Sequence, residues 1–245
     1  MSSEFSDLTF VKAAETLAGS VVLLPFGSVE PHGPHLPLAT DTILSVETAR
    51  RAAVKIKNTG SRVFVAPAIP YAVTDFSKGF AGRISLSPST AAALALEICL
   101  AIAEAVPKKI LLITLHFEPE HIQCLRAAAA ACREKTGVDT VFVDFTKRRA
   151  AERIGGEFAT GSCHAGSFES SLVMAARPEL VMNTIREGLP NHTVPLPERM
   201  KAGAKTFLEC GMTDAYCGEP AAASASEGDR LYNLLSDLVA ESARA

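Results

Sequence analysis

The sequence predicts an α/β protein in which a mainly parallel central sheet lies between two layers of helices, a three-layer α/β/α sandwich. The first observation is that short, almost wholly apolar segments alternate with Ala-rich segments of helical periodicity. Strands that are buried on both faces give such continuous apolar runs. The second observation is that the 245 residues contain no internal repeat and no low-complexity linker. A single domain over residues 1–245 is therefore expected.

Four short apolar segments are expected to be the strands of this sheet. Each holds Val, Ile, Leu or Phe at most positions and is bounded by polar residues or proline. Apolar runs of about four to eight residues are typical of buried strands. The four expected strands are residues 21–25, 63–67, 109–115 and 140–145.

Five segments with helical periodicity are expected to cover the sheet, and the clearest helix start lies at Pro88. Ser87 suits the N-cap, because its hydroxyl can accept a backbone hydrogen bond, and proline is favoured at the first helical position. Residues 178–218 hold several prolines and are expected to form a loop or lid. The five expected helices are residues 41–56, 88–106, 120–135, 167–176 and 231–242.

Charge and hydrophobicity argue against several classes of partner. The formal net charge is −3, and the basic cluster Lys147-Arg148-Arg149 is typical of a solvated helix face, so no nucleic-acid partner is expected. The apolar stretch 91–106 is interrupted by Glu97 and Glu104 and is too short to span a bilayer. The N-terminus lacks the basic start and apolar run of a signal peptide. A cytoplasmic protein without a membrane partner is therefore expected.

Metal chemistry is indicated first by residues 26–41, which follow the first expected strand. They hold Glu30, His32, His35 and Asp41 between glycines and prolines that restrict the path of the chain. Carboxylates and imidazoles are ligands for zinc, manganese or iron, and a carboxylate can bridge two such ions. For His35 three roles stay open, namely metal ligand, orienting residue or structural residue, and the orienting role is preferred. The alternative is a polar turn whose histidines bond only to the backbone.

His116 and Glu118 follow directly after the third expected strand. Residues two apart in an extended chain point to the same side, so both side chains can face one site. Parallel sheets bind ligands beyond the carboxyl ends of their strands, which is where these residues and residues 26–41 fall. The alternative is a solvated strand end. Glu120 and His121, which come next, are interpreted as surface or helix-capping residues.

A histidine set between small residues marks a third segment, 161–171. His164 stands beside Cys163 and precedes Ala165-Gly166, so a substrate can approach it closely. Glu169, early in the following helix, is expected to cap the backbone or to orient a ligand histidine. The alternative is a structural histidine near a helix start.

Other catalytic motifs are absent from the sequence. No GxSxG segment supports a serine hydrolase, and no GxGxxG or P-loop pattern follows a strand, so no nucleotide cofactor is expected. The six cysteines form no CxxC pair, which favours reduced thiols over disulfides. Cys163 and His164 are adjacent in the chain and are therefore a weak candidate for a catalytic thiol pair.

Taken in order, the motifs resemble those of the creatininase (creatinine amidohydrolase) family. Residues 27–37 with Asp41 are similar to the family signature, and His116-Phe117-Glu118 is similar to its second metal motif. Residues 164–166 with 169–171 resemble the third motif. The C-terminal segment of the family is similar to residues 218–220 and 225–228.

The resemblance implies a three-layer α/β/α fold with a mainly parallel sheet and a site for two divalent metal ions. Zinc is the first expectation, with manganese or iron as alternatives. Asp41 would bridge the ions, Glu30 and His116 would complete one shell, and His32 and Glu118 would complete the other. The family typically assembles as a hexamer, so a homo-oligomer is expected.

The resemblance also implies catalytic roles. His164 would be the acid/base residue that helps to open the scissile amide, and Glu118 is assigned as ligand or catalytic base. The implied activity is that of a metal-dependent amidohydrolase, in which a water activated by two metal ions hydrolyses a C–N bond of a small cyclic amide.

Departures from the family pattern bear on the substrate. Creatinine-hydrolysing members enclose their substrate with tryptophans, and this chain has none, which argues against creatinine itself. Thr114-Leu115 and Pro119 replace the residues usual around the second motif. The alternatives are a hydrolase of a formamide or keto-sugar with the same metal site, and a non-catalytic metal-binding paralogue. Aromatic residues expected as candidates for a pocket wall are Tyr71, Phe76, Phe80 and Phe117.

Overall fold

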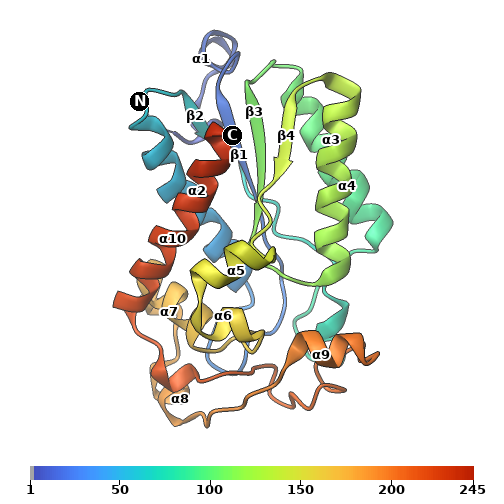
Figure 1. Ribbon diagram of the computed structural model, residues 1–245, viewed down its shortest axis with the longest axis vertical. Helices are drawn as coiled ribbons and strands as arrows, with labels where there is room; N and C mark the ends of the chain where they lie inside the picture. Colours follow the sequence, from blue (N-terminus) through green and yellow to red (C-terminus); the bar gives the residue numbers. More distant parts are fainter. Residues whose placement is uncertain (1–2) are drawn as a thin grey trace.

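Four parallel strands form the central sheet, in the order β2-β1-β3-β4 (Figure 1). The structure is a computed structural model that describes residues 3–245. The register pairs Val21 with Val63 on one side and with Lys109 on the other. The strands are β1 (Val21–Phe26), β2 (Val63–Val65), β3 (Lys109–Thr114) and β4 (Asp139–Phe142). All four expected strands are therefore present, and β2 and β4 end earlier than expected.

Two helical layers cover the sheet. Successive strand residues point to opposite faces, so Leu23 and Leu111 pack into one core and Leu24 and Leu112 into the other. The first core is closed by α2 (Thr40–Lys57), α7 (Ser167–Ala176) and α10 (Ala225–Arg244), and the second by α3 (Pro88–Ala103) and α4 (Pro119–Thr136). Figure 1 shows the two groups on opposite sides of the strands, so the predicted three-layer α/β/α sandwich is confirmed.

Side-chain caps begin two of these helices. The Ser87 hydroxyl accepts the backbone N–H of Thr90 at 3.2 Å, as predicted for the start of α3. The Ser224 hydroxyl likewise caps α10, which begins six residues before the predicted 231. Gly228 lies in this first turn, and its missing side chain is what the packing requires. A Cβ atom there would lie 2.0 Å from the carbonyl oxygen of Ser171 in α7.

The short helices α5, α6, α8 and α9 gather at the end of the molecule toward which the strands point, whereas α1 lies at the opposite end (Figure 1). The segment predicted as loop or lid, residues 178–218, contains two short helices joined by irregular chain. Within residues 3–245, no helix is both long and apolar enough to cross a membrane. The short helices are α1 (Phe10–Thr16), α5 (Arg148–Ile154), α6 (Gly156–Thr160), α8 (Asn183–Gly188) and α9 (Leu196–Lys201), and the 3-10 turns are η1 (Phe5–Asp7), η2 (Asp75–Ser77), η3 (Pro178–Leu180) and η4 (Pro220–Ala222).

Candidate metal centre

The strand order places a crevice between the carboxyl ends of β1 and β3. The chain leaves β1 for β2 on one side and then returns past β1 to β3 on the other, and ligands bind at such reversals. The loop after β1 carries Glu30 and His32, the first turn of α2 carries Asp41, and the residue pair after β3 includes His116. Gly27 lets the loop pass close to α2, because a Cβ there would lie 2.2 Å from the hydroxyl of Thr42.

The first group of candidate ligands is Glu30, Asp41 and His116. The Nδ1 atom of His116 lies 3.0 Å from Oε1 of Glu30 and 3.0 Å from Oδ2 of Asp41. The other ring nitrogen, Nε2, lies 2.7 Å from the carbonyl oxygen of Val73, and a carbonyl can only accept, so Nε2 carries a proton. In neutral His116 the lone pair of Nδ1 would then face two carboxylates. A proton or a metal ion bound at Nδ1 would remove the electrostatic repulsion between this lone pair and the two carboxylates.

The second group is His32, Asp41 and Glu169. His32 Nε2 lies 3.2 Å from Oδ1 of Asp41 and 3.5 Å from Oε2 of Glu169. His32 Nδ1 donates to the carbonyl oxygen of Glu30 at 3.1 Å, so the same reasoning leaves an imidazole lone pair facing two carboxylates. Asp41 thus divides its two oxygens between two histidines. The hydroxyl of Ser28 fixes the Asp41 carboxylate by donating to Oδ2 at 2.6 Å.

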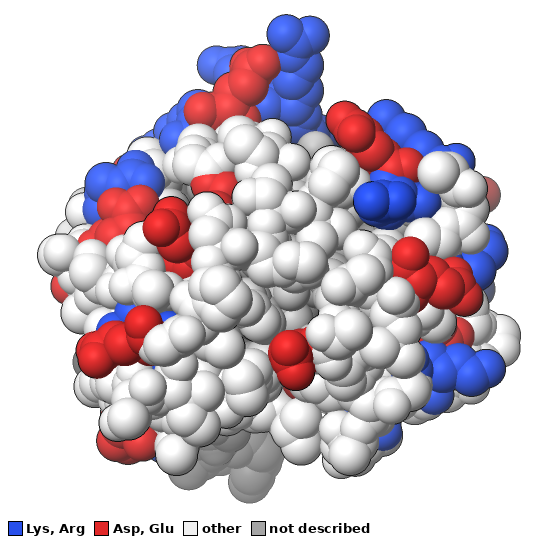
Figure 2. Space-filling model, turned by 90° about the horizontal axis from the view of Figure 1, so that it is seen from below, with Lys and Arg blue, Asp and Glu red and all other residues white. Residues whose placement is uncertain are grey.

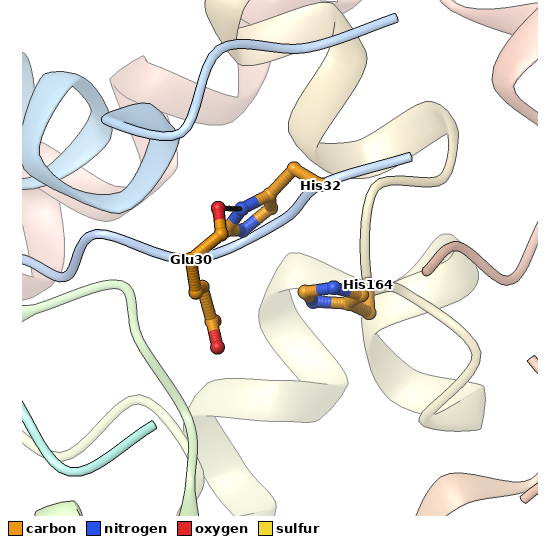
Figure 3. Close-up of side chains that lie close together, drawn as sticks. All are labelled: Glu30, His32 and His164. Carbon is orange, nitrogen blue, oxygen red and sulfur yellow. Dashed lines mark hydrogen bonds between the residues drawn. The ribbon is translucent and has the colours of Figure 1, made fainter. Parts of the chain in front are cut away.

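A third group joins the first two across the cavity. Glu30, His32 and His164 each place one ligand atom within 4.8 Å of the others. Figure 3 shows the Glu30 carboxylate and the His164 ring directed into the same space, with the His32 ring above it. The Nε2 atom of His164 donates to the carbonyl oxygen of Pro31 at 3.0 Å, and its ring stacks against Phe207 with centroids 4.2 Å apart.

Burial and charge act in opposite directions on these groups. Burial disfavours the charged form of His32, but the Asp41 and Glu169 carboxylates outweigh it and raise the pKa of His32 to about 10. Burial likewise works against the ionised form of Asp41, yet His32 and His116 hold its pKa well below the usual value. Glu30 Oε2 is buried without a hydrogen-bond partner among the described residues. Buried carboxylates and imidazoles with unpaired atoms match the donor set of a cation site.

Glu118 lines the same cavity but lies outside all three groups within residues 3–245. Its two carboxylate oxygens accept the backbone N–H groups of Asp75 at 3.0 Å and Phe76 at 3.2 Å. These bonds hold the carboxylate against η2, and the predicted role of Glu118 as a metal ligand stays a prediction. Glu169, predicted to cap or to orient, is the carboxylate that groups with His32 and Asp41. Burial raises the pKa of Glu118 to about 7 despite the positive charge of His116.

The other predicted polar residues have different environments. His35 Nε2 lies 2.8 Å from the hydroxyl of Ser170, the residue after Glu169 in the chain, and the orienting role of His35 stays a prediction. His121 was expected at the surface or at a helix cap, and this is wrong. It is buried against Phe26 and His116, and neither ring nitrogen has a hydrogen-bond partner within residues 3–245.

The cavity wall is largely aromatic and aliphatic. Of the four predicted wall residues, Phe76 and Phe117 line the cavity, whereas Tyr71 is 43% exposed and Phe80 packs against a neighbouring apolar cluster. Phe207 was not predicted as part of the wall, because it comes from the irregular segment 178–218. Cys163 lines the cavity too, and burial holds its pKa well above the usual value, so its thiol is protonated at neutral pH.

A groove of about 1270 Å³ lies beside the cavity at the candidate metal centre, which is about 440 Å³, and both volumes include open solvent at the mouth. Phe117, Cys163, Leu196 and Met200 line both spaces, which therefore adjoin each other. Phe158 adds to the apolar floor of the groove. Figure 2 views the molecule from the end toward which the strands point, and the middle of this face is mostly uncharged, with Lys, Arg, Asp and Glu more frequent toward its rim.

Fold and site together define an α/β/α protein with a candidate centre for one or two divalent cations. The model of the family described as creatinine amidohydrolase matches residues 6–243. The chain belongs to the creatininase family.

Curated relatives and solved structures agree with this assignment. A mycofactocin precursor peptide peptidase from Mycolicibacterium smegmatis is 30% identical over 217 residues, which cover 86% of this chain and 79% of the relative. A mycofactocin precursor peptide peptidase from Mycobacterium ulcerans is 28% identical, and the match covers 91% of this chain and 84% of the relative. A crystal structure of creatinine amidohydrolase has a TM-score of 0.79 at 21% identity and covers 98% of this chain and 96% of its own. Another solved structure, described as Creatininase Mn, has a TM-score of 0.78 at 21% identity, and the match covers 100% of this chain and 98% of the other.

Proposed function

We propose that this protein is a metal-dependent hydrolase that cleaves an amide C–N bond with two divalent cations. Glu30, Asp41 and His116 would hold one ion, and His32, Asp41 and Glu169 would hold the other. The observation that carries the proposal is the division of the two Asp41 oxygens between His116 and His32, each of which faces two carboxylates with a nitrogen lone pair. Zinc remains the first expectation, with manganese or iron as alternatives.

The bound cations would supply Lewis acidity for a carbonyl oxygen and a lower pKa for a nearby water molecule. Glu118 stands beside the first group with its carboxylate held by η2, and we assign it to take a proton from water and return it to the leaving nitrogen. His164 is buried between His32 and Phe207, and its Nε2–H is committed to Pro31. The lone pair on its Nδ1 atom is then available to accept a hydrogen bond from the substrate.

We infer that the substrate is a peptide or peptide-like amide rather than the small cyclic amide favoured by the sequence. The groove that adjoins the cavity would hold an extended chain, and its apolar lining suits an apolar side chain near the scissile bond. The names of the curated relatives, precursor peptide peptidases, support this choice. A small cyclic amide is the second candidate, because the resemblance to the creatininase family implies it.

The two departures beside the second motif do not obstruct the site. Leu115 is fully buried, and its backbone N–H donates to the Ser45 hydroxyl at 2.9 Å. Pro119 occupies the first position of α4, where proline is favoured. Both features therefore have a structural explanation, which weakens the alternative of a non-catalytic paralogue. The hexameric assembly and the cytoplasmic location stay predictions.

A substrate panel on metal-reconstituted protein tests the proposal. Protein stripped with a chelator and reloaded with Zn²⁺ or Mn²⁺ should hydrolyse short peptides with apolar residues faster than lactams, creatinine, formamides or keto-sugars. A matched control is Glu118→Gln, which should keep the metal and lose turnover. Full metal occupancy with no turnover of any substrate would contradict the proposal, and faster turnover of lactams would favour the second candidate.

A further inference from the structure

Glu157, in α6, joins two segments that are far apart in the sequence. Its Oε2 atom accepts the backbone N–H of Phe168 at 3.0 Å, and its Oε1 atom accepts the backbone N–H of Glu219. Phe168 lies at the start of α7, whereas Glu219 follows the irregular segment that covers the site. One carboxylate thus ties the beginning of α7 to the chain that leads into α10.

Two glycines allow the backbone to approach the Glu157 carboxylate this closely. A Cβ atom on Gly166 would lie 2.4 Å from Oε2 of Glu157, and a Cβ atom on Gly218 would lie 2.3 Å from Oε1. Both backbones therefore reach the carboxylate only because they lack side chains. Gly166 is also the N-cap of α7 and has no side chain to accept the first N–H groups of the helix. Glu157 supplies this missing cap from another element.

The tied segments carry two members of the candidate site. His164 and Glu169 stand on either side of Gly166, and the carbonyl oxygen of His164 accepts the backbone N–H of Cys217 at 2.8 Å. Glu169 is bound back to the same loop, because its Oε2 atom accepts the backbone N–H of Ala165 at 2.7 Å. A shift of the Gly166 backbone relative to Gly218 would therefore move both side chains relative to His32.

We propose that Glu157 is a positioning residue that holds His164 and Glu169 in register with the metal ligands. The inference rests on the proposed metal site. Partners that orient ligands are worth about 10–100-fold in metal affinity or activity, since ligand geometry must be held within a fraction of an ångström. Glu157 touches none of the three ligand groups itself and acts through the backbone that it binds.

The test compares Glu157→Gln and Glu157→Asp with the control Glu152→Gln. Gln keeps the shape of the side chain and one acceptor oxygen, whereas Asp keeps the negative charge on a shorter side chain. Glu152 is a suitable control because it forms an exposed ion pair with Arg148 on α5. Zn²⁺ affinity is measured by competition with a chromogenic chelator, and folding by thermal unfolding of the metal-free protein. We expect both Glu157 variants to bind the second Zn²⁺ about tenfold more weakly, while metal-free folding changes little and Glu152→Gln resembles the wild type.

A second measurement asks whether Glu157 acts through His164. Glu157→Gln should lower kcat with little change in KM, and it should add little further loss in a His164→Ala background. Unchanged Zn²⁺ affinity and unchanged kcat in both Glu157 variants would overturn the inference, as would losses that only follow the unfolded fraction. A wild-type protein that binds no Zn²⁺ would instead overturn the metal site itself, so the two failures are distinguishable.

Discussion

The Oδ2 atom of Asp41 lies 3.0 Å from Nδ1 of His116, and the other Asp41 oxygen faces away from this histidine toward the second ligand group. Asp41 is the carboxylate common to both groups of the proposed two-ion site. Because α2 begins at Thr40, the first helical turn aims this side chain at the carboxyl end of β3.

Asp41→Asn should remove both ions. The amide keeps the shape of the carboxylate but loses its negative charge, so each candidate ion loses a ligand. Elemental analysis should fall from two metal ions per chain toward none, and turnover should fall with it. Asp229→Asn, which changes a side chain 62% exposed at the surface, is the matched control. Two metals and full activity in the Asp41 variant would show that this carboxylate is no ligand.

Glu169→Gln and Glu118→Gln should give different phenotypes. Glu169 faces His32 within the second group, so its substitution should remove one ion and leave the other in place. Glu118 belongs to no group within residues 3–245, so its substitution should leave both ions and lower kcat by about 100-fold or more. Metal content and kcat are measured on the same preparations. The reverse pattern, with metal lost from Glu118→Gln, would restore Glu118 as the ligand.

Phe207→Leu should weaken catalysis with a modest effect on folding. The substitution keeps an apolar side chain in the wall but removes the stacked contact with His164, whose centroid distance is 4.2 Å. Such ring pairs are worth about 0.5–1.5 kcal/mol, so kcat/KM should fall by about 2–13-fold. Phe80→Leu is the control, because Phe80 packs on the same apolar cluster but does not line the cavity. Equal losses in the two variants would point to the cluster rather than to the stack.

Asp144→Asn should lower stability in a pH-dependent manner. Asp144 accepts hydrogen bonds from Thr146 and Arg126, and although burial acts the other way, these partners lower its pKa below 3.8. A carboxyl group whose pKa is lower in the folded than in the unfolded state stabilises the protein at pH values above its unfolded-state pKa. This stabilisation is lost as the pH falls through the folded-state pKa. The variant should be about 1–2 kcal/mol less stable at pH 7. Urea unfolding should show the difference shrinking below pH 3.8, and a difference that grows in acid would contradict the assignment.

Tyr232→Phe should not destabilise the protein. The hydroxyl of Tyr232 is fully buried and has no hydrogen-bond partner within residues 3–245. An unsatisfied buried polar group costs about 1–3 kcal/mol, so its removal should leave the free energy of unfolding unchanged or raise it. The ring contact with Arg51, whose guanidinium lies 4.5 Å from the ring centroid, is available to Phe as well. A loss of stability would indicate a buried water bound to the hydroxyl.

Some features of this protein follow from short stretches of sequence. The continuous apolar runs predict strands buried on both faces, and with helices between them they predict the parallel, three-layer fold. Ser87-Pro88 predicts a helix start because an N-cap is a local interaction. Glu30, His32 and Asp41 come from one stiff loop and the helix turn after it, so their proximity is largely a property of the chain.

The tertiary structure alone decided which carboxylate joins His32. The direction of Glu118 depends on two backbone N–H groups more than 40 residues earlier in the chain, and the direction of Glu169 depends on the loop before α7. The burial of His121 and the approach of Phe207 to His164 have the same origin. Local patterns carry no information on such contacts, because a side chain points to the partners that folding brings to it from elsewhere.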